Sequence, residues 1–301
     1  MPLDADLLLD RRRLKRRLSL WRVGAVLAAA AFAMALLWRD ELPGKGGPHI
    51  ARLSVQGFIG EDRKLIEALD RLRRDPQARG LIVAIDSPGG GVAAGEALHH
   101  ALARISAEKP VVAVMAGTAA SAAYMAAMPA ARVFARDSTV TGSIGVILQS
   151  FEVSELMARV GVRAETIGSG PFKGVPNPFQ PMPEAGRAQL ARVVEDLHDQ
   201  FVALVVAGRR MEPARVRELA DGRVFTGREA VALGLVDAIG GEPEARAWLA
   251  AERALPASLP VREVESRSFT ERTFGAFFGS LIKGIADEWV GVDRVRALWQ
   301  P

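Results

Sequence analysis

Three short stretches of glycine and serine carry the residue types that bind a carbonyl oxygen or act as a nucleophile. They are Asp86–Gly91 (DSPGGG), Gly117–Tyr124 (GTAASAAY) and Gly168–Gly174 (GSGPFKG). Each stretch follows a predicted strand, and open α/β sheets form their sites beyond the carboxyl ends of strands. We therefore expect any chemistry of this chain to take place at these three stretches.

The first stretch is suited to hold a negatively charged oxygen. Its three consecutive glycines, at positions 89, 90 and 91, let backbone N–H groups approach a ligand closely, as an oxyanion hole requires. The same residues would also make a tight turn before a helix. The residues of this stretch alone leave both interpretations open.

Ser121 is the candidate nucleophile of the second stretch. It stands at the start of a predicted helix, Ser121–Met128, where the helix dipole and free N–H groups stabilise developing negative charge. Its small neighbours leave room for a substrate. The alternative is an ordinary helix N-cap, a position that serine favours.

Lys173 is the candidate base of the third stretch. A serine hydroxyl needs an adjacent base, and a lysine serves as one when burial favours its neutral amine. The alternative is a solvated charge on a loop. Ser121 and Lys173 lie 52 positions apart, so their spacing does not show whether they meet.

Several other kinds of site are excluded by the sequence. The chain has no cysteine and 4 histidines, none of them spaced as the two zinc ligands of a helix. It lacks a phosphate-binding P-loop, a Gly-x-Gly-x-x-Gly fingerprint and a Gly-x-Ser-x-Gly elbow. We expect no metal and no organic cofactor. The adjacent His99 and His100 are expected on the surface of a helix.

All of the net charge of +4 comes from the N-terminal region. Residues 1–45 hold 9 basic and 5 acidic residues, and the remainder holds 30 of each. A folded body without a basic excess argues against nucleic-acid binding.

A basic cluster, Arg11–Arg17, precedes an apolar stretch, Leu18–Trp38. The stretch has about the 20 residues that a spanning helix needs, and the basic flank should stay in the cytoplasm. We predict a cytoplasmic segment at 1–17 and a transmembrane anchor at 18–38, in the inner (cytoplasmic) membrane, with the catalytic domain on the periplasmic side. A cleaved signal peptide is the alternative.

The rest of the chain predicts an α/β domain at 49–255, after a linker at 39–48 and before a helical C-terminal extension at 256–301. Helical periodicity alternates with short apolar runs, as in α/β proteins. The predicted strands are Ile50–Val55, Leu81–Ile85, Val111–Met115, Arg132–Ala135, Gly145–Leu148 and Val162–Ile167. Gly168–Pro183 is rich in glycine and proline and is predicted to be a loop, and Thr226 with Glu229 predicts a capping box.

Taken in order along the chain, these motifs resemble the signal peptide peptidase A family in its short, single-domain form. The resemblance covers roughly residues 48–250. It rests on Asp86–Gly90, Ala120-Ser121 with Tyr124, Thr141–Val146, Phe172-Lys173 with Asn177-Pro178 and Pro181-Met182, Gly222–Gly227 and Gly234–Asp237.

This resemblance implies a ClpP/crotonase-like fold and a serine peptidase whose Ser121 and Lys173 form a catalytic dyad. Backbone N–H groups of Gly89, Gly90 and Ala122 are then the oxyanion-hole candidates. It also implies a ring-like homo-oligomer, with the dyad shared between neighbouring copies. The expected substrates are hydrophobic peptides such as signal peptides left in the bilayer.

Ser143 is a further candidate, which would orient the Lys173 amine through a hydrogen bond, although a structural turn serine is an equal interpretation. The chain departs from the family where Ala122-Ala123 replace two glycines after Ser121. This departure favours one alternative, a non-catalytic membrane scaffold of the same fold. A crotonase-type acyl-CoA enzyme and a membrane-protein quality-control peptidase are the others.

Overall fold

The computed structural model describes residues 47–264 together with residues 21, 22, 24, 25, 27 and 28. These six N-terminal residues are helical and exposed, and with Gly47 and Asp75–Gln77 they belong to a first compact unit. The second unit holds all other described residues. The predicted segment 1–17, most of the predicted anchor 18–38 and the extension beyond residue 264 lie outside the described residues. Within them, no helix combines the length and apolar character that a membrane crossing requires.

The second unit is built on one sheet of eight strands, in which β6-β5-β3-β2-β1-β8 are neighbours, β4 pairs with β3, and β7 pairs with β4. All pairs are parallel except β5 with β6. Parallel strands are buried on both faces, which explains the continuous apolar runs in the sequence. The strands are β1 (His49–Ile59), β2 (Ala78–Gly90), β3 (Val111–Ala120), β4 (Arg132–Ala135), β5 (Val140–Gly142), β6 (Val224–Thr226), β7 (Ala238–Ile239) and β8 (Val261–Glu263).

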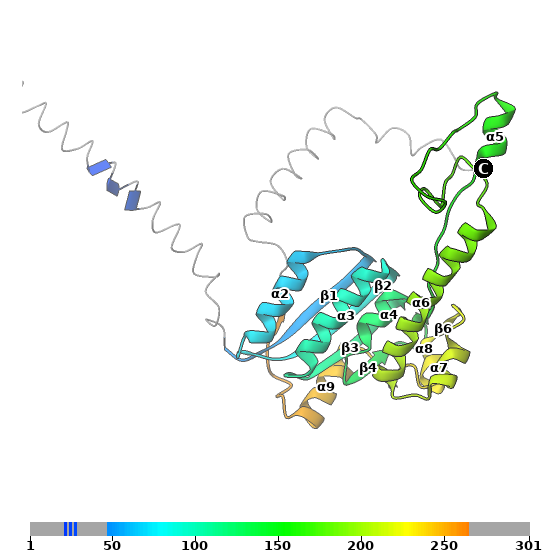
Figure 1. Cartoon of the computed structure of the whole chain (residues 1–301). Coiled ribbons are helices and arrows are strands. Elements are labelled where there is room, and N and C mark those ends of the chain that lie inside the picture. The colour runs from blue at the N-terminus through cyan, green and yellow to red at the C-terminus, as the bar shows by residue number, and fades with distance from the viewer. Residues whose placement is uncertain (1–20, 23, 26, 29–46, 265–301) are drawn as a thin grey trace, which may run out of the picture. The chain divides into compact units, whose positions relative to one another are not determined.

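Helices cover both faces of this sheet. Alternate residues of each central strand face opposite sides: Leu81 packs with α3 and α4, and Ile82 packs with α9. Figure 1 shows α2, α3 and α4 side by side along one face. The helices are α2 (Arg63–Arg74), α3 (Val92–Ser106), α4 (Ala122–Ala127), α5 (Ser154–Arg159), α6 (Glu184–Arg209), α7 (Pro213–Leu219), α8 (Gly227–Ala232) and α9 (Glu242–Arg253).

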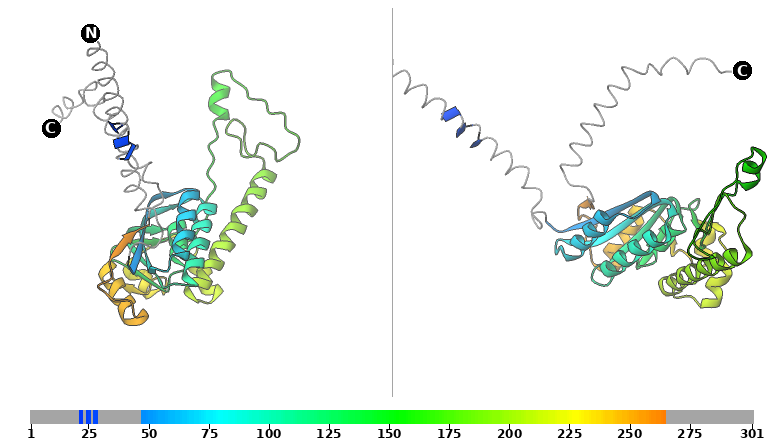
Figure 2. Two further views of the ribbon diagram at one scale, coloured as in Figure 1. Left: turned by 90° about the vertical axis from the view of Figure 1, so that its left-hand side faces the viewer. Right: turned by 45° about the horizontal axis from the view of Figure 1, so that its top comes forward.

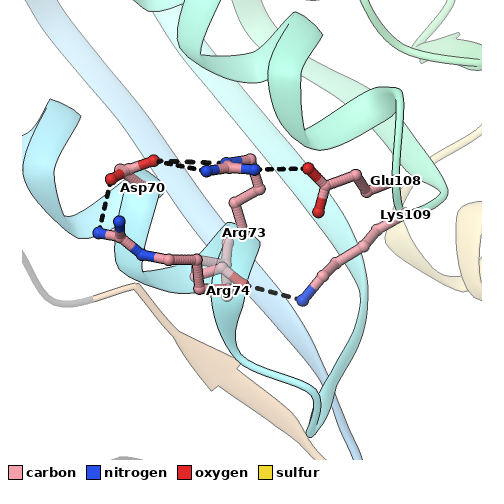
Figure 3. A network of polar contacts seen from close by, with 6 residues as sticks. Asp70, Arg73, Arg74, Glu108 and Lys109 are labelled. Atoms are coloured by element: carbon pink, nitrogen blue, oxygen red, sulfur yellow. Dashed lines mark hydrogen bonds and ion pairs between the residues drawn. The ribbon is translucent and has the colours of Figure 1, made fainter.

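A polar network joins the end of α2 to the end of α3 (Figure 3). Arg73 pairs with Asp70 on its own helix and with Glu108 just after α3. The Lys109 amine donates a hydrogen bond of 2.9 Å to the Leu72 carbonyl. Partly exposed ion pairs of this kind contribute little stability each, so we regard the network as a local contact between two helix ends.

The structure corrects the sequence predictions at two predicted strands and one boundary. Residues 145–148 and 162–167 are irregular, and the strand in this region is β5 instead. The loop predicted at Gly168–Pro183 and the capping box of Thr226 with Glu229 are confirmed. Strand β8 pairs with β1, so the sheet extends beyond the boundary predicted at residue 255.

Candidate active site

The first two motif stretches meet at the carboxyl ends of β2 and β3. Both strands run further than predicted, through the motifs to Gly90 and Ala120. Asp86 Oδ1 accepts a hydrogen bond of 3.0 Å from the Thr118 N–H. A Cβ placed on Gly89 would stand 2.9 Å from Ser121 Cβ. Only a residue without a side chain fits there, so the glycine stretch lies directly against the candidate nucleophile.

Ser121 has a strained backbone at the junction of β3 and α4. Its φ is 54° and its ψ is −125°, a conformation that L-residues rarely adopt. Its N–H donates to the Gly142 carbonyl at 3.0 Å, and its carbonyl accepts from the Met125 N–H at 3.0 Å. Such strain costs roughly 1–3 kcal/mol and gathers at functional sites.

The Ser121 hydroxyl does not cap the helix that follows it. Ser121 occupies the N-cap position of α4, yet its side chain makes no capping hydrogen bond. Within the described part of the chain, no hydrogen-bond partner is found for this hydroxyl, and the residue is half-buried. The N-cap alternative for this residue therefore receives no support.

The backbone N–H groups around Ser121 differ in what they already bind. The Gly89 N–H donates to Ser87 Oγ at 3.1 Å. The Gly91 N–H donates to the Ile59 carbonyl of β1 at 3.0 Å. Successive N–H groups of a strand point to opposite neighbours, so the Gly90 N–H is directed away from β1, towards the β3 side. Gly90 is therefore a better oxyanion-hole candidate than Gly89.

Ala122 opens α4 and fits its place despite the departure from two glycines. Residues at the start of a helix have N–H groups with no intrahelical acceptor. Among the described residues other than glycine, a positive φ occurs at Ser121, Ser143, Arg210 and Ala254, so Ala122 needs no glycine-specific backbone. Its buried methyl faces α3 at Gly95, where an added Cβ would stand 2.8 Å from the Ala122 Cβ.

Ser143 lies one residue beyond the carbonyl that binds the Ser121 backbone. It also has a positive φ of 48°, and its N–H donates to the Arg223 carbonyl at 2.9 Å. Within the described residues its half-buried hydroxyl has no hydrogen-bond partner. The structure thus brings Ser143 into the neighbourhood of Ser121.

Lys173 lies elsewhere, in a segment that we call the arm, residues 146–183. The arm carries α5 and stands at the far end of α6 from the sheet (Figures 1 and 2). The Lys173 side chain is exposed. The backbone N–H of Lys173 donates a hydrogen bond of 3.1 Å to the Gly170 carbonyl and closes a turn. Within the described part of this single chain, no hydrogen bond joins Lys173 to Ser121.

Two residues around α4 have roles that the sequence did not reveal. The Tyr124 hydroxyl donates to the Leu235 carbonyl at 2.8 Å, and burial raises the pKa of Tyr124. The prediction of a surface position for His99 is wrong: the ring is buried between α3 and α4, with Nδ1 3.1 Å from the Met125 carbonyl. Burial lowers the pKa of His99. The long-range contact with α4 buries the ring, and helical periodicity gives no sign of it.

The motif Gly234–Asp237 has a structural role beside the same helix. Arg209 donates to both carboxylate oxygens of Asp237, at 3.0 and 2.8 Å, and the Val133 N–H donates to this carboxylate at 2.7 Å. Burial would raise the pKa of Asp237, but hydrogen bonds from Arg209 and its positive charge lower it overall. This half-buried pair joins α6 to β4, next to Leu235, whose carbonyl accepts the hydrogen bond of the Tyr124 hydroxyl.

An α/β sheet with a strained serine between strand and helix, against a glycine-rich strand end, is an arrangement suited to acyl transfer. Residues 103–256 match peptidase family S49, and residues 60–144 match the Clp protease family. The chain belongs to peptidase family S49. It is a serine peptidase with a mixed α/β, ClpP-like fold.

Several known proteins are similar to this chain. A putative protease of Synechocystis sp. is 37% identical over 203 residues, which cover 67% of this chain and 73% of the relative. A putative signal peptide peptidase SppA of Enterococcus faecium is 29% identical over 276 residues, 85% of this chain and 78% of the relative. Protease 4 of Salmonella typhi is 34% identical over 185 residues, 61% of this chain and 30% of that protein.

Proposed function

We propose that the chain is a membrane-anchored serine endopeptidase that uses Ser121 and Lys173 to hydrolyse hydrophobic peptides, such as cleaved signal peptides. The observation that carries the proposal is Ser121 itself. Its backbone is strained, its hydroxyl has no hydrogen-bond partner among the described residues, and a residue without a side chain lies against it. The relative described as a signal peptide peptidase supports the substrate class.

In the proposed mechanism, the neutral Lys173 amine takes the proton of the Ser121 hydroxyl while Oγ attacks the peptide carbonyl. The N–H groups of Gly90 and Ala122 bind the resulting oxyanion, each worth about 3–4 kcal/mol in comparable sites. Lys173 then protonates the leaving amine. Water hydrolyses the acyl-enzyme with the same amine as base, and Ser143 orients that amine by a hydrogen bond.

The dyad is proposed to form between neighbouring copies of the chain. The arm exposes large hydrophobic side chains to an extent unusual for a free surface. They are Ile147, Leu148, Phe151, Leu156, Val160, Val162, Ile167, Phe172 and Phe179. A second copy would cover these side chains and bring Lys173 of one copy to Ser121 of the next. Desolvation there would favour the neutral amine of a lysine.

The membrane anchor remains a proposal from the sequence of residues 18–38, with residues 1–17 in the cytoplasm and the peptidase domain on the periplasmic side. An anchor keeps the site near hydrophobic peptides released into the bilayer. The structure also accommodates the methyl of Ala122, which was the feature that favoured a non-catalytic scaffold.

Fluorophosphonate labelling of the full chain in detergent tests the dyad. We expect label on Ser121 in the parent and none in Ser121→Ala or Lys173→Ala, whereas the control Lys64→Ala, an exposed lysine of α2, should label normally. Mixing the two inactive variants should restore labelling if neighbouring copies share the dyad. Normal labelling of Lys173→Ala would refute the assignment of the base.

A further inference from the structure

Phe58 stands out as a large apolar side chain at the end of a central strand. It is 76% exposed, although it belongs to β1, whose other large apolar residues are buried. Between residues 48 and 146, the large hydrophobic side chains that are exposed are Phe58 and Val140. A single exposed phenylalanine is common on protein surfaces, so its position decides whether it has a function.

The register of the sheet puts Phe58 beside the candidate nucleophile. Phe58 pairs with Gly89 on β2, and directly paired residues of adjacent strands project to the same face of a sheet. A Cβ on Gly89 would stand 2.9 Å from Ser121 Cβ. Phe58 therefore lies beside Gly89, one strand spacing (about 4.8 Å) from the residue that lies against Ser121.

Phe58 keeps the regular alternation of β1 next to a local irregularity of the sheet, because Gln56 and Phe58 are exposed whereas Val55 and Ile59 are buried. From Gln56 to Phe58 the strand advances two residues, while β2 advances three, from Asp86 to Gly89. Gly57 between them has a φ of 65°. The extra residue therefore lies in β2, directly before Gly89, and bulges are frequent next to active sites.

The surface around Phe58 has room for a peptide. A Cβ added at Gly57 or at Gly60 would meet nothing within 4 Å. Gly89 itself presents no side chain between the Phe58 ring and Ser121. A peptide whose carbonyl rests at Ser121 would thus pass over Gly89, with an adjacent side chain within contact range of the ring, about 4.5 Å.

We propose that Phe58 contacts an apolar side chain of the substrate within two residues of the scissile bond, and so makes the enzyme prefer apolar residues at that position. This inference rests on the proposed acyl transfer at Ser121 and adds a residue that selects the substrate. The occupant of the surface is the peptide, and the alternative is contact with a second copy of the chain.

A set of internally quenched peptides tests the inference with the full chain in detergent. One residue at a time, within two positions of the cleaved bond, is changed from alanine to leucine or phenylalanine. The cleavage rate of each peptide is divided by the fraction of Ser121 that the fluorophosphonate finally labels, which corrects for the fraction of intact sites. Discriminations of about tenfold or more are typical of apolar pockets.

At one of the varied peptide positions, the unmutated protein should cleave the leucine peptide faster than the alanine peptide. Phe58→Ala should lower this preference about tenfold. Phe58→Leu should keep the preference for leucine and provides a second, conservative variant. Ile239→Ala, at an exposed apolar residue of β7 that pairs with β4, is the matched control and should change nothing.

An unchanged preference in a labelled Phe58→Ala would overturn the inference and leave the dyad intact. Dissociation of the oligomer by Phe58→Ala, measured by light scattering, with no change in preference would assign the residue to a contact between copies and also overturn it. Peptide cleavage that survives Ser121→Ala would instead refute the proposed function, and with it the role of Phe58.

Discussion

Replacing Gly95 with alanine should displace the helix that follows the nucleophile. The new Cβ would stand 2.8 Å from Ala122 Cβ, 3.3 Å from Ala122 Cα and 3.4 Å from Met125 Sδ, whereas carbon atoms in contact prefer about 3.5–4.0 Å. Overpacking of this kind costs about 1–3 kcal/mol, and the better helix propensity of alanine returns up to about 1 kcal/mol. We expect a net loss of about 1–2 kcal/mol.

The partner variant Ala122→Gly removes the atom that makes the shortest contact. The double variant should therefore be more stable than the sum of the single effects predicts, with a coupling of about 1 kcal/mol or more.

The labelling rate of Ser121 should follow the same pattern. Because Gly95→Ala displaces the Ala122 N–H, labelling of Ser121 should slow at least tenfold, given that loss of an oxyanion donor costs about 100–1,000-fold.

Thermal unfolding of the full chain and the labelling rate of Ser121 measure the two effects. A loss of 1 kcal/mol in the free energy of unfolding lowers the midpoint of thermal unfolding by roughly 2–4 °C for a domain of this size. Gly60→Ala is a control for the general effect of a glycine replacement, since a Cβ there meets nothing within 4 Å. Additive effects of Gly95→Ala and Ala122→Gly would refute the proposed contact between α3 and the start of α4.

Two further predictions concern the buried polar groups around α4. Tyr124→Phe removes the hydroxyl that binds the Leu235 carbonyl and should cost about 1–3 kcal/mol by leaving a buried carbonyl unpaired; an unchanged midpoint of thermal unfolding would contradict this. Burial lowers the pKa of His99. Below about pH 6.5 the unfolded chain therefore takes up a proton that the folded chain does not, and the folded state loses stability as the pH falls. His99→Asn should lose less stability between pH 7.5 and 5.5 than the parent, and equal losses would refute the role of His99.

The central strands could be predicted from the sequence because their signal is local. Leu81–Ile85 and Val111–Met115 are apolar runs with few other interpretations, and both lie in buried parallel strands. Pairing with neighbouring backbone extends these strands to Gly90 and Ala120, and no local pattern shows such pairing. The three-residue strand β5 was not predicted for the same reason, because it is a strand only through its pairing with β3 and β6.

The candidate site was predictable in its parts and less so in its geometry. The sequence identified Ser121 and the glycine stretch, but their direct contact depends on the register of β2 and β3. The extra residues that β3 inserts between Met115 and Ala119, opposite Ile85 and Ser87, bring Ser121 to Gly89. Such irregularities arise from the packing of the whole sheet, and short-range propensity does not encode them.

The fold holds the two members of the proposed dyad in different ways. Ser121 is fixed from both sides, because its N–H binds the Gly142 carbonyl and its carbonyl binds the first turn of α4. Lys173 has an exposed side chain in an irregular segment. A catalytic pair requires both members to be positioned within about half an ångström. If Lys173 is the base, the contact that covers the arm must supply this precision, and catalytic activity should therefore depend on assembly.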